Sequence, residues 1–172
     1  MTAMVTMPPA TTERCRLLLQ RWRQDLRLTR REQGLLRGEL TLLDRQLQRL
    51  EHNVLRLAVF GRVGVGKSSL INALVGQRLL ETDVAHGSTR RQQAVTWPLK
   101  LDGLQRVELI DTPGIDEIDA AGRTRLATRV AMGVDLVLLV IDSDLTRCDR
   151  DALQTLQASG KPVRLVLNRT GL

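Results

Sequence analysis

The sequence is poor in aromatic residues, which make up 2% of its 172 residues: Phe60, Trp22 and Trp97, with no tyrosine. Proteins that bind single-stranded nucleic acid by base stacking need several exposed rings, so the composition disfavours that class. Cysteine is also scarce. Cys15 and Cys148 are too few and too far apart in the sequence to suggest a disulfide framework or a metal site.

Long apolar runs and targeting signals are missing as well. The longest apolar run, residues 136–141, has the length of a buried strand, whereas a membrane-spanning helix needs roughly 18 to 20 residues. The first 13 residues lack the basic start and apolar block of a signal peptide. These absences predict a cytoplasmic protein.

Lysine is rare among the 26 basic residues, with only Lys67, Lys100 and Lys161. The net charge of +7 therefore comes from arginines that are spread along the whole chain. Such a charge is compatible with a nucleic-acid partner, although no compact basic block stands out. Hydrophobic residues make up 42% of the chain, which is enough for one sizeable core.

The chain divides into three segments by pattern. Residues 1–12 read as a flexible leader, residues 13–52 as a helical segment, and residues 53–172 as strands alternating with helices. The helical segment carries an apolar stripe with heptad spacing, in two registers, each interrupted by one polar residue: Leu19, Leu26, Gln33, Leu40 and Leu47, and Trp22, Thr29, Leu36, Leu43 and Leu50.

Three interpretations of this stripe stay open. It covers an apolar patch of the following domain, it associates with a second copy as a coiled coil, or its arginine-rich outer face contacts a membrane surface. Gly34 and Gly38 weaken the helix at outer positions, so a break near them would turn one rod into a helical hairpin.

Beyond residue 52 the pattern predicts a mostly parallel sheet with helices between its strands. We expect strands at 54–60, 94–99, 106–110, 134–141 and 162–167, and helices at 67–74, 124–132 and 149–158.

A phosphate-binding loop is the strongest motif. It reads Gly61-Arg62-Val63-Gly64-Val65-Gly66-Lys67-Ser68, and lies between an apolar strand and a helix. The glycines let the backbone bend so that amide hydrogens point at phosphate oxygens. A lysine at this position reaches the β- and γ-phosphates, and the following hydroxyl is a suitable oxygen ligand for Mg²⁺.

A second motif, Asp111-Thr112-Pro113-Gly114, directly follows a predicted strand. A carboxylate at the end of a strand can hold Mg²⁺, and a glycine amide three residues later can meet a γ-phosphate. Alone this pattern marks a turn, but paired with the loop it predicts a nucleoside-triphosphate site.

Both motifs, together with Ser69-Leu70-Ile71-Asn72-Ala73-Leu74, resemble those of the translation-factor-related GTPases of the Era and TrmE type. The resemblance covers about residues 54–170. Larger cyanobacterial GTP-binding proteins that join helices to such a domain are similar in arrangement.

The resemblance implies GTP or GDP and Mg²⁺ as ligands, with Lys67, the loop and Ser69 on the phosphates, and Ser68, Thr89 and Asp111 at the metal. Switch segments are expected at about 80–92 and 111–125. Thr89 would close over the γ-phosphate and takes a catalytic role with Lys67; Ser88 is the fallback. His86 is expected to be an ordinary loop residue.

Asn168 and Arg169 match the first half of the motif with which these GTPases read guanine, but Gly171 stands where the family has an aspartate. Ile115 follows Gly114 where the Ras style has a water-orienting glutamine, which implies slow hydrolysis. Gly64 stands where potassium-activated members have asparagine, so that activation is not expected.

The sequence therefore predicts an α/β, three-layer P-loop domain with a mostly parallel sheet and an N-terminal helical extension. The family's last strand, its guanine-contacting loop and its last helix have no counterpart, so we interpret the sheet as incomplete at its C-terminal end. We expect a Mg²⁺-dependent GTP switch with slow hydrolysis. The alternatives are a nucleotide binder without base selectivity and a non-catalytic module assembled through residues 13–52. An RNA partner also stays open.

Overall fold

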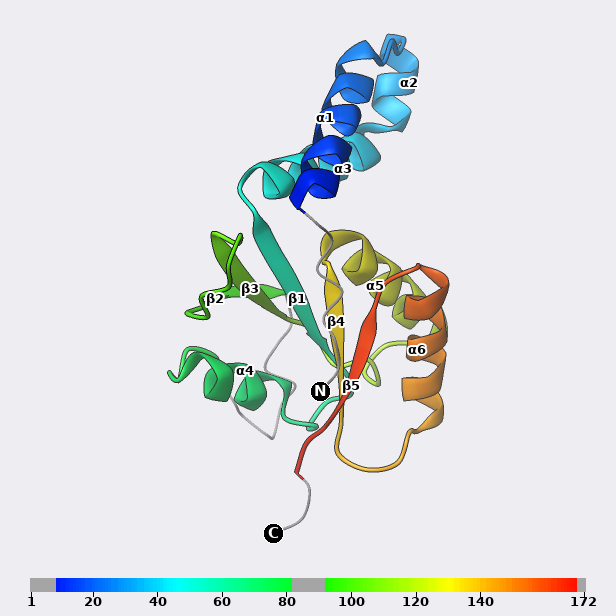
Figure 1. Cartoon of the computed structure of the whole chain (residues 1–172). Helices are drawn as coiled ribbons and strands as arrows, with labels where there is room; N and C mark the ends of the chain where they lie inside the picture. Colours follow the sequence, from blue (N-terminus) through cyan, green and yellow to red (C-terminus); the bar gives the residue numbers. More distant parts are fainter. Residues whose placement is uncertain (1–8, 82–91, 170–172) are drawn as a thin grey trace. The chain divides into compact units, whose positions relative to one another are not determined.

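The computed structural model describes residues 9–81 and 92–169 (Figure 1). Two compact units make up the chain: a helical unit, Met1–Val54 with Leu101–Gln105, and a sheet unit, Leu55–Lys100 with Arg106–Leu172. No helix in these described ranges is both long and apolar enough to cross a membrane.

The helical unit contains three helices where the heptad pattern allowed one rod: α1 (Pro9–Asp25), α2 (Arg30–Leu35) and α3 (Arg37–Glu51). The chain breaks at two places. Leu36 separates α2 from α3 and lies between Gly34 and Gly38, so the predicted break near these glycines is confirmed. A further break, which the pattern did not predict, lies at residues 26–29 between α1 and α2. The Thr29 side chain accepts from the Glu32 amide, and the Glu32 carboxylate accepts from the Thr29 amide, so a capping box starts α2.

Polar contacts join α1 to α3. The Arg23 guanidinium donates to both carboxylate oxygens of Asp44, at 2.8 and 3.2 Å. Leu47 is the one described stripe residue of α3 that is fully buried, whereas Leu19 and Trp22 on α1 are exposed. The stripe is thus only partly buried within this unit, and its role in self-association stays a prediction.

The sheet unit has five strands in the order β2-β3-β1-β4-β5 (Figure 1). Their bounds are β1 Val54–Phe60, β2 Gln93–Trp97, β3 Arg106–Asp111, β4 Leu136–Ile141 and β5 Val163–Leu167. β4 runs parallel to β1 and β5, with Leu57 opposite Leu136, while β2 pairs antiparallel with β3. The expectation of a mostly parallel sheet is confirmed.

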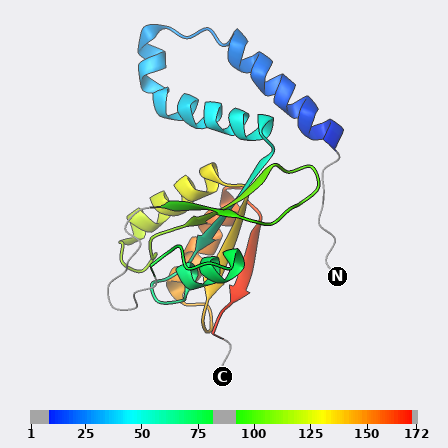
Figure 2. The same ribbon diagram turned by 90° about the vertical axis from the view of Figure 1, so that its left-hand side faces the viewer.

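Helices cover both faces of this sheet. Figures 1 and 2 show α4 (Lys67–Val75) on one face and α5 (Ala120–Gly133) and α6 (Arg147–Ala158) on the other. Both α5 and α6 begin a few residues before their predicted starts because Asp119 and Thr146 cap them. The three-layer P-loop architecture is therefore confirmed.

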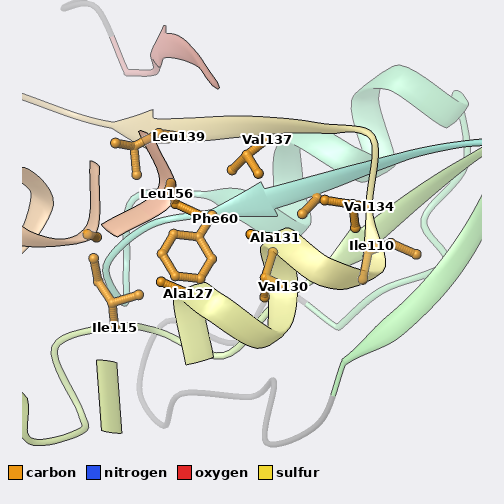
Figure 3. Packing of buried hydrophobic residues seen from close by; sticks show 12 residues of the cluster. Phe60, Ile110, Ile115, Ala127, Val130, Ala131, Val134, Val137, Leu139 and Leu156 are labelled. Carbon is orange, nitrogen blue, oxygen red and sulfur yellow. The ribbon is translucent and has the colours of Figure 1, made fainter. Parts of the chain in front are cut away.

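One cluster of buried apolar residues lies between the sheet and the pair α5 and α6, and α4 adds the buried Ile71 and Val75. In Figure 3, Phe60 of β1 points at Ala127 and Val130 of α5, with Ile115 beside them. Phe60 and Ile115 have no exposed surface. The core therefore extends up to the ends of the strands, where the two predicted motifs begin.

Candidate functional site

The phosphate loop connects β1 to α4 as predicted, and its shape depends on glycine. Gly66 caps α4 with a left-handed backbone, φ +87°. A Cβ atom at Gly66 would also come within 2.4 Å of the Asn168 side-chain nitrogen. Both the conformation and the close approach exclude a larger residue here.

The start of α4 has the properties of an anion site. Its N-cap, Gly66, has no side chain that could cap the first turn, and the amides of that turn point out of the helix end. Lys67 opens the helix, is buried, and donates from Nζ to the Arg62 carbonyl oxygen at 2.7 Å. Burial lowers the pKa of Lys67 below its usual value, while the negative charges of Asp111, Asp116 and Glu117 oppose that shift.

Ser68 and Asp111 come together at the centre of the site. The Ser68 hydroxyl donates to Asp111 Oδ2 at 2.7 Å, and Asp111 itself is almost fully buried. A hydroxyl and a carboxylate oxygen in contact form an oxygen-only donor set, which suits Mg²⁺ better than a soft metal. Among the described residues no group of three or more His, Cys, Asp or Glu is arranged to hold a metal ion by itself, so Mg²⁺ at this site would also take oxygens from the nucleotide or water.

The second motif is fastened to the sheet and to the loop. The Thr112 hydroxyl donates to the Val59 carbonyl oxygen of β1 at 2.8 Å. The Ile115 amide donates to the Gly61 carbonyl oxygen at 3.3 Å. Gly114 packs so closely on Val63 that a Cβ atom would lie 2.9 Å from the Val63 nitrogen. The two motifs, far apart in sequence, thus form one continuous surface.

Asn168 also reaches the phosphate loop. Its side-chain amide donates to the Val65 carbonyl oxygen at 2.8 Å, and its backbone amide donates to the Ile141 carbonyl oxygen at 2.7 Å. Arg169 follows with a positive φ of 56°, and its Nε lies 3.9 Å from the position of a Cβ on Gly66. The structure therefore brings both predicted residues of this third motif to the loop.

Sequence reasoning missed an ion-pair cluster behind the loop. The Arg62 guanidinium donates to Asp142 Oδ1 at 2.7 Å and to Asp149 Oδ2 at 3.1 Å. Asp149 has no exposed side-chain surface, and it also closes the capping box with Thr146 at the start of α6. The Thr146-x-x-Asp149 spacing signals the cap, but nothing in the sequence pairs Asp149 with Arg62.

Several predicted residues lie outside the described residues. Thr89, Ser88 and His86 fall within residues 82–91, and Gly171 falls within residues 170–172. Their predicted roles stay predictions. Of the proposed metal ligands, the structure brings Ser68 and Asp111 together.

Comparison with known proteins supports this assembly of motifs. Residues 56–169 match the family of 50S ribosome-binding GTPases. The GTPase Der of Rhizobium johnstonii is 42% identical over 120 residues, which are 66% of this chain and 25% of that protein. The GTPase Der of Bartonella tribocorum is 39% identical over 122 residues, which are 67% of this chain and 25% of that protein. The chain therefore spans about a quarter of the length of the curated relatives it matches.

Solved structures give a concordant fold. Era in complex with MgGDPNP and nucleotides 1506–1542 of 16S ribosomal RNA has a TM-score of 0.56 and 26% identity, over 67% of this chain and 40% of that chain. A dimerisation-deficient mutant of Toc33 from Arabidopsis thaliana has a TM-score of 0.50 and 23% identity, over 73% of this chain and 56% of that chain. The Toc33 likeness shows the fold alone.

Proposed function

The chain belongs to the family of 50S ribosome-binding GTPases, and from that premise we propose that it binds GTP and GDP with Mg²⁺, hydrolyses GTP slowly and acts as a nucleotide-dependent switch. One observation carries this proposal: Ser68 and Asp111 meet at 2.7 Å beside the buried Lys67. Oxygen ligands, a positive charge and unpaired helix amides are what a magnesium nucleotide requires of a binding site.

Each residue has a definite role in this proposal. Lys67 leaves the Arg62 carbonyl oxygen and donates to the β- and γ-phosphates, while the amides of residues 64–69 surround the β-phosphate. Ser68 and Asp111 hold the metal, with Thr89 as the predicted third residue. Bound Mg²⁺ supplies positive charge that neutralises phosphate oxygens. The Gly114 amide is proposed to contact the γ-phosphate.

Slow hydrolysis follows from the residue after Gly114. Ile115 is fully buried, and its backbone amide is bonded to Gly61. An apolar side chain packed in the core cannot orient an attacking water. The reaction therefore depends on a group outside this segment, such as a partner protein or another residue.

Guanine selectivity is the finer part of the proposal. Asn168 lies against the loop, where its amide holds the Val65 carbonyl oxygen. The residue expected to read the base edge is Gly171, which has no carboxylate. Loss of base selectivity is therefore the alternative, and competition between nucleotides separates the two.

The test is displacement of fluorescent GTP from the purified chain, in Mg²⁺, by unlabelled GTP, GDP or ATP. We expect displacement by GTP and GDP but not by ATP, and loss of binding in Lys67→Ala. Lys100→Ala is the matched control, because Lys100 is an exposed lysine outside the site. Equal displacement by ATP would support the unselective alternative. No binding by folded protein would overturn the nucleotide proposal and favour an interaction module built on the helical unit.

A ribosomal RNA partner is a second candidate. The family description and the Era complex name ribosomal partners for those proteins, and the net charge of +7 favours contact with phosphate backbones. Co-sedimentation with ribosomal subunits in GDPNP or in GDP tests this candidate. Binding that depends on the nucleotide and weakens steeply with salt would support it.

A further inference from the structure

Asp116 is an exposed residue just beyond the second motif, and neither motif includes it. In the structure its Oδ1 accepts a hydrogen bond of 2.7 Å from the Val63 amide, in the phosphate loop. The contact joins residues 53 positions apart in the sequence. The Asp116 carboxylate thus accepts from a backbone amide of the loop that is proposed to bind phosphate, which is also an anion.

The neighbouring contacts fix where this carboxylate lies. Gly114 packs on Val63, and Ile115 is bonded to Gly61 while its side chain is buried. Residues 114–116 therefore follow residues 61–63 across the loop. Since Asp116 is exposed, its side chain can leave Val63 for water without disturbing the core.

This end of the loop is the end at which a third phosphate is expected. Lys67 serves the β- and γ-phosphates, and the Gly114 amide faces the γ-phosphate in the proposed function. Asp116 acts on the same place, because its charge is one of those that oppose the effect of burial on the Lys67 ammonium. A γ-phosphate would therefore be bound close to a carboxylate of like charge.

We propose that Asp116 is a specificity-determining residue that weakens binding of nucleoside triphosphates relative to diphosphates. The proposal deepens the proposed function and rests on it. A diphosphate leaves the Asp116–Val63 hydrogen bond intact, whereas a γ-phosphate repels the carboxylate and breaks that bond. The Asp116–Val63 hydrogen bond thus differs between the two nucleotides, while the Gly114 amide contacts the γ-phosphate as proposed.

The test compares the dissociation constants of GDP and GDPNP in Mg²⁺ for the full chain, Asp116→Asn and Asp116→Ala. Asparagine keeps an oxygen for the Val63 amide but removes the charge. We expect Asp116→Asn to strengthen GDPNP binding about three- to tenfold relative to GDP, the effect of removing one partly screened like charge nearby. The matched control is Asp151→Asn, which removes an exposed carboxylate of α6 that is not among the charges acting on Lys67. Its ratio should change by less than about twofold.

The outcomes separate the two levels of the argument. A GDPNP-to-GDP ratio in Asp116→Asn within twofold of the wild type would overturn the inference and leave nucleotide binding standing. An equal shift in Asp151→Asn would also overturn it, because the effect would then come from general surface charge. Failure of the folded wild type to bind either nucleotide would overturn the proposed function together with the inference.

Discussion

Arg62 is the residue whose removal tests the architecture of the phosphate loop most directly. Its guanidinium bridges Asp142, just after β4, and Asp149, in the first turn of α6. Its carbonyl oxygen accepts from Lys67. Arg62→Ala therefore removes the link between the loop and two other elements, and leaves a buried carboxylate without its cation.

The expected loss of stability follows from the burial of the three groups. Removing one partner of a buried ion pair costs about 3–5 kcal/mol. The cost here is smaller because Asp142 is 27% exposed and can regain water, and because Asp149 Oδ2 keeps the Thr146 amide and hydroxyl. Asp149 Oδ1, however, has no hydrogen-bond partner among the described residues. The Arg62 guanidinium is therefore an important counter-charge for this buried carboxylate. We expect Arg62→Ala to lower the free energy of unfolding by about 2–3 kcal/mol.

Urea unfolding followed by tryptophan fluorescence measures this loss. The chain has two tryptophans, and Trp22→Phe leaves Trp97 of β2 as a reporter of the sheet unit alone. With a slope of about 1.5–2 kcal/mol per molar urea, the midpoint should fall by roughly 1–2 M. Arg62→Lys should lie between the wild type and Arg62→Ala, because one ammonium cannot span both carboxylates as the guanidinium does.

Arg106→Ala provides the matched control. Arg106 makes an ion pair with Glu108 at 2.8 Å, but its side chain is 51% exposed. Exposed pairs contribute about 0–1 kcal/mol, so this midpoint should change little. Equal midpoints for Arg62→Ala and Arg106→Ala would refute the reasoning that burial makes the Arg62 cluster important.

Three further predictions test other parts of the structure. Gly114→Ala should lower stability by about 1–3 kcal/mol in thermal unfolding, because its Cβ would collide with Val63, whereas Gly133→Ala, with open space around it, should not. Leu165→Lys should reduce light scattering of concentrated protein while leaving the Tm nearly unchanged, since this leucine is 51% exposed on edge strand β5. Hydrogen bonds from the Thr29 side chain and backbone lower the pKa of Glu32, so its stabilisation of α2 is present above the usual value of 4.5 and is lost as pH falls through the lowered pKa. Protection of the Thr29 amide from hydrogen exchange, corrected for intrinsic rates, should therefore fall in acid, and Glu32→Gln should remove this dependence.

Local chemistry explains which elements could be predicted. Residues 54–60 form β1 as expected because a mostly apolar segment, interrupted only by Arg56, ends at Gly61. The helix α4 begins at Lys67 because the glycine before it takes a left-handed conformation. The starts predicted for α5 and α6 lie too far along the chain because the apolar pattern begins only after the first turn of each helix. Asp119 and Thr146 are the N-caps of these helices, and both are residue types that favour this position.

The heptad stripe shows the limit of periodicity. Seven-residue spacing continues through residues 26–29, yet the helix stops there and α2 begins after Thr29. The Thr29 and Glu32 capping box provides a local alternative to continuing the helix, and Arg23 finds Asp44 only when the chain folds back. The spacing of apolar residues indicates which face of a helix can be buried, but it does not predict capping boxes or ion pairs between distant residues.

The remaining failures share one cause, which is distance along the chain. The predicted motifs are contiguous, so their chemistry follows from spacing alone. Arg62 and Asp149 are 87 positions apart, and Val63 and Asp116 are 53 apart, so only the parallel sheet brings them together at the carboxyl ends of β1, β3 and β4. Arg62 joins the loop to Asp142 and Asp149, and Asp116 accepts a hydrogen bond from the Val63 amide. The first contact includes the fully buried carboxylate of Asp149, whereas the second involves an exposed carboxylate, so only the second can be exchanged for water without stranding a buried charge.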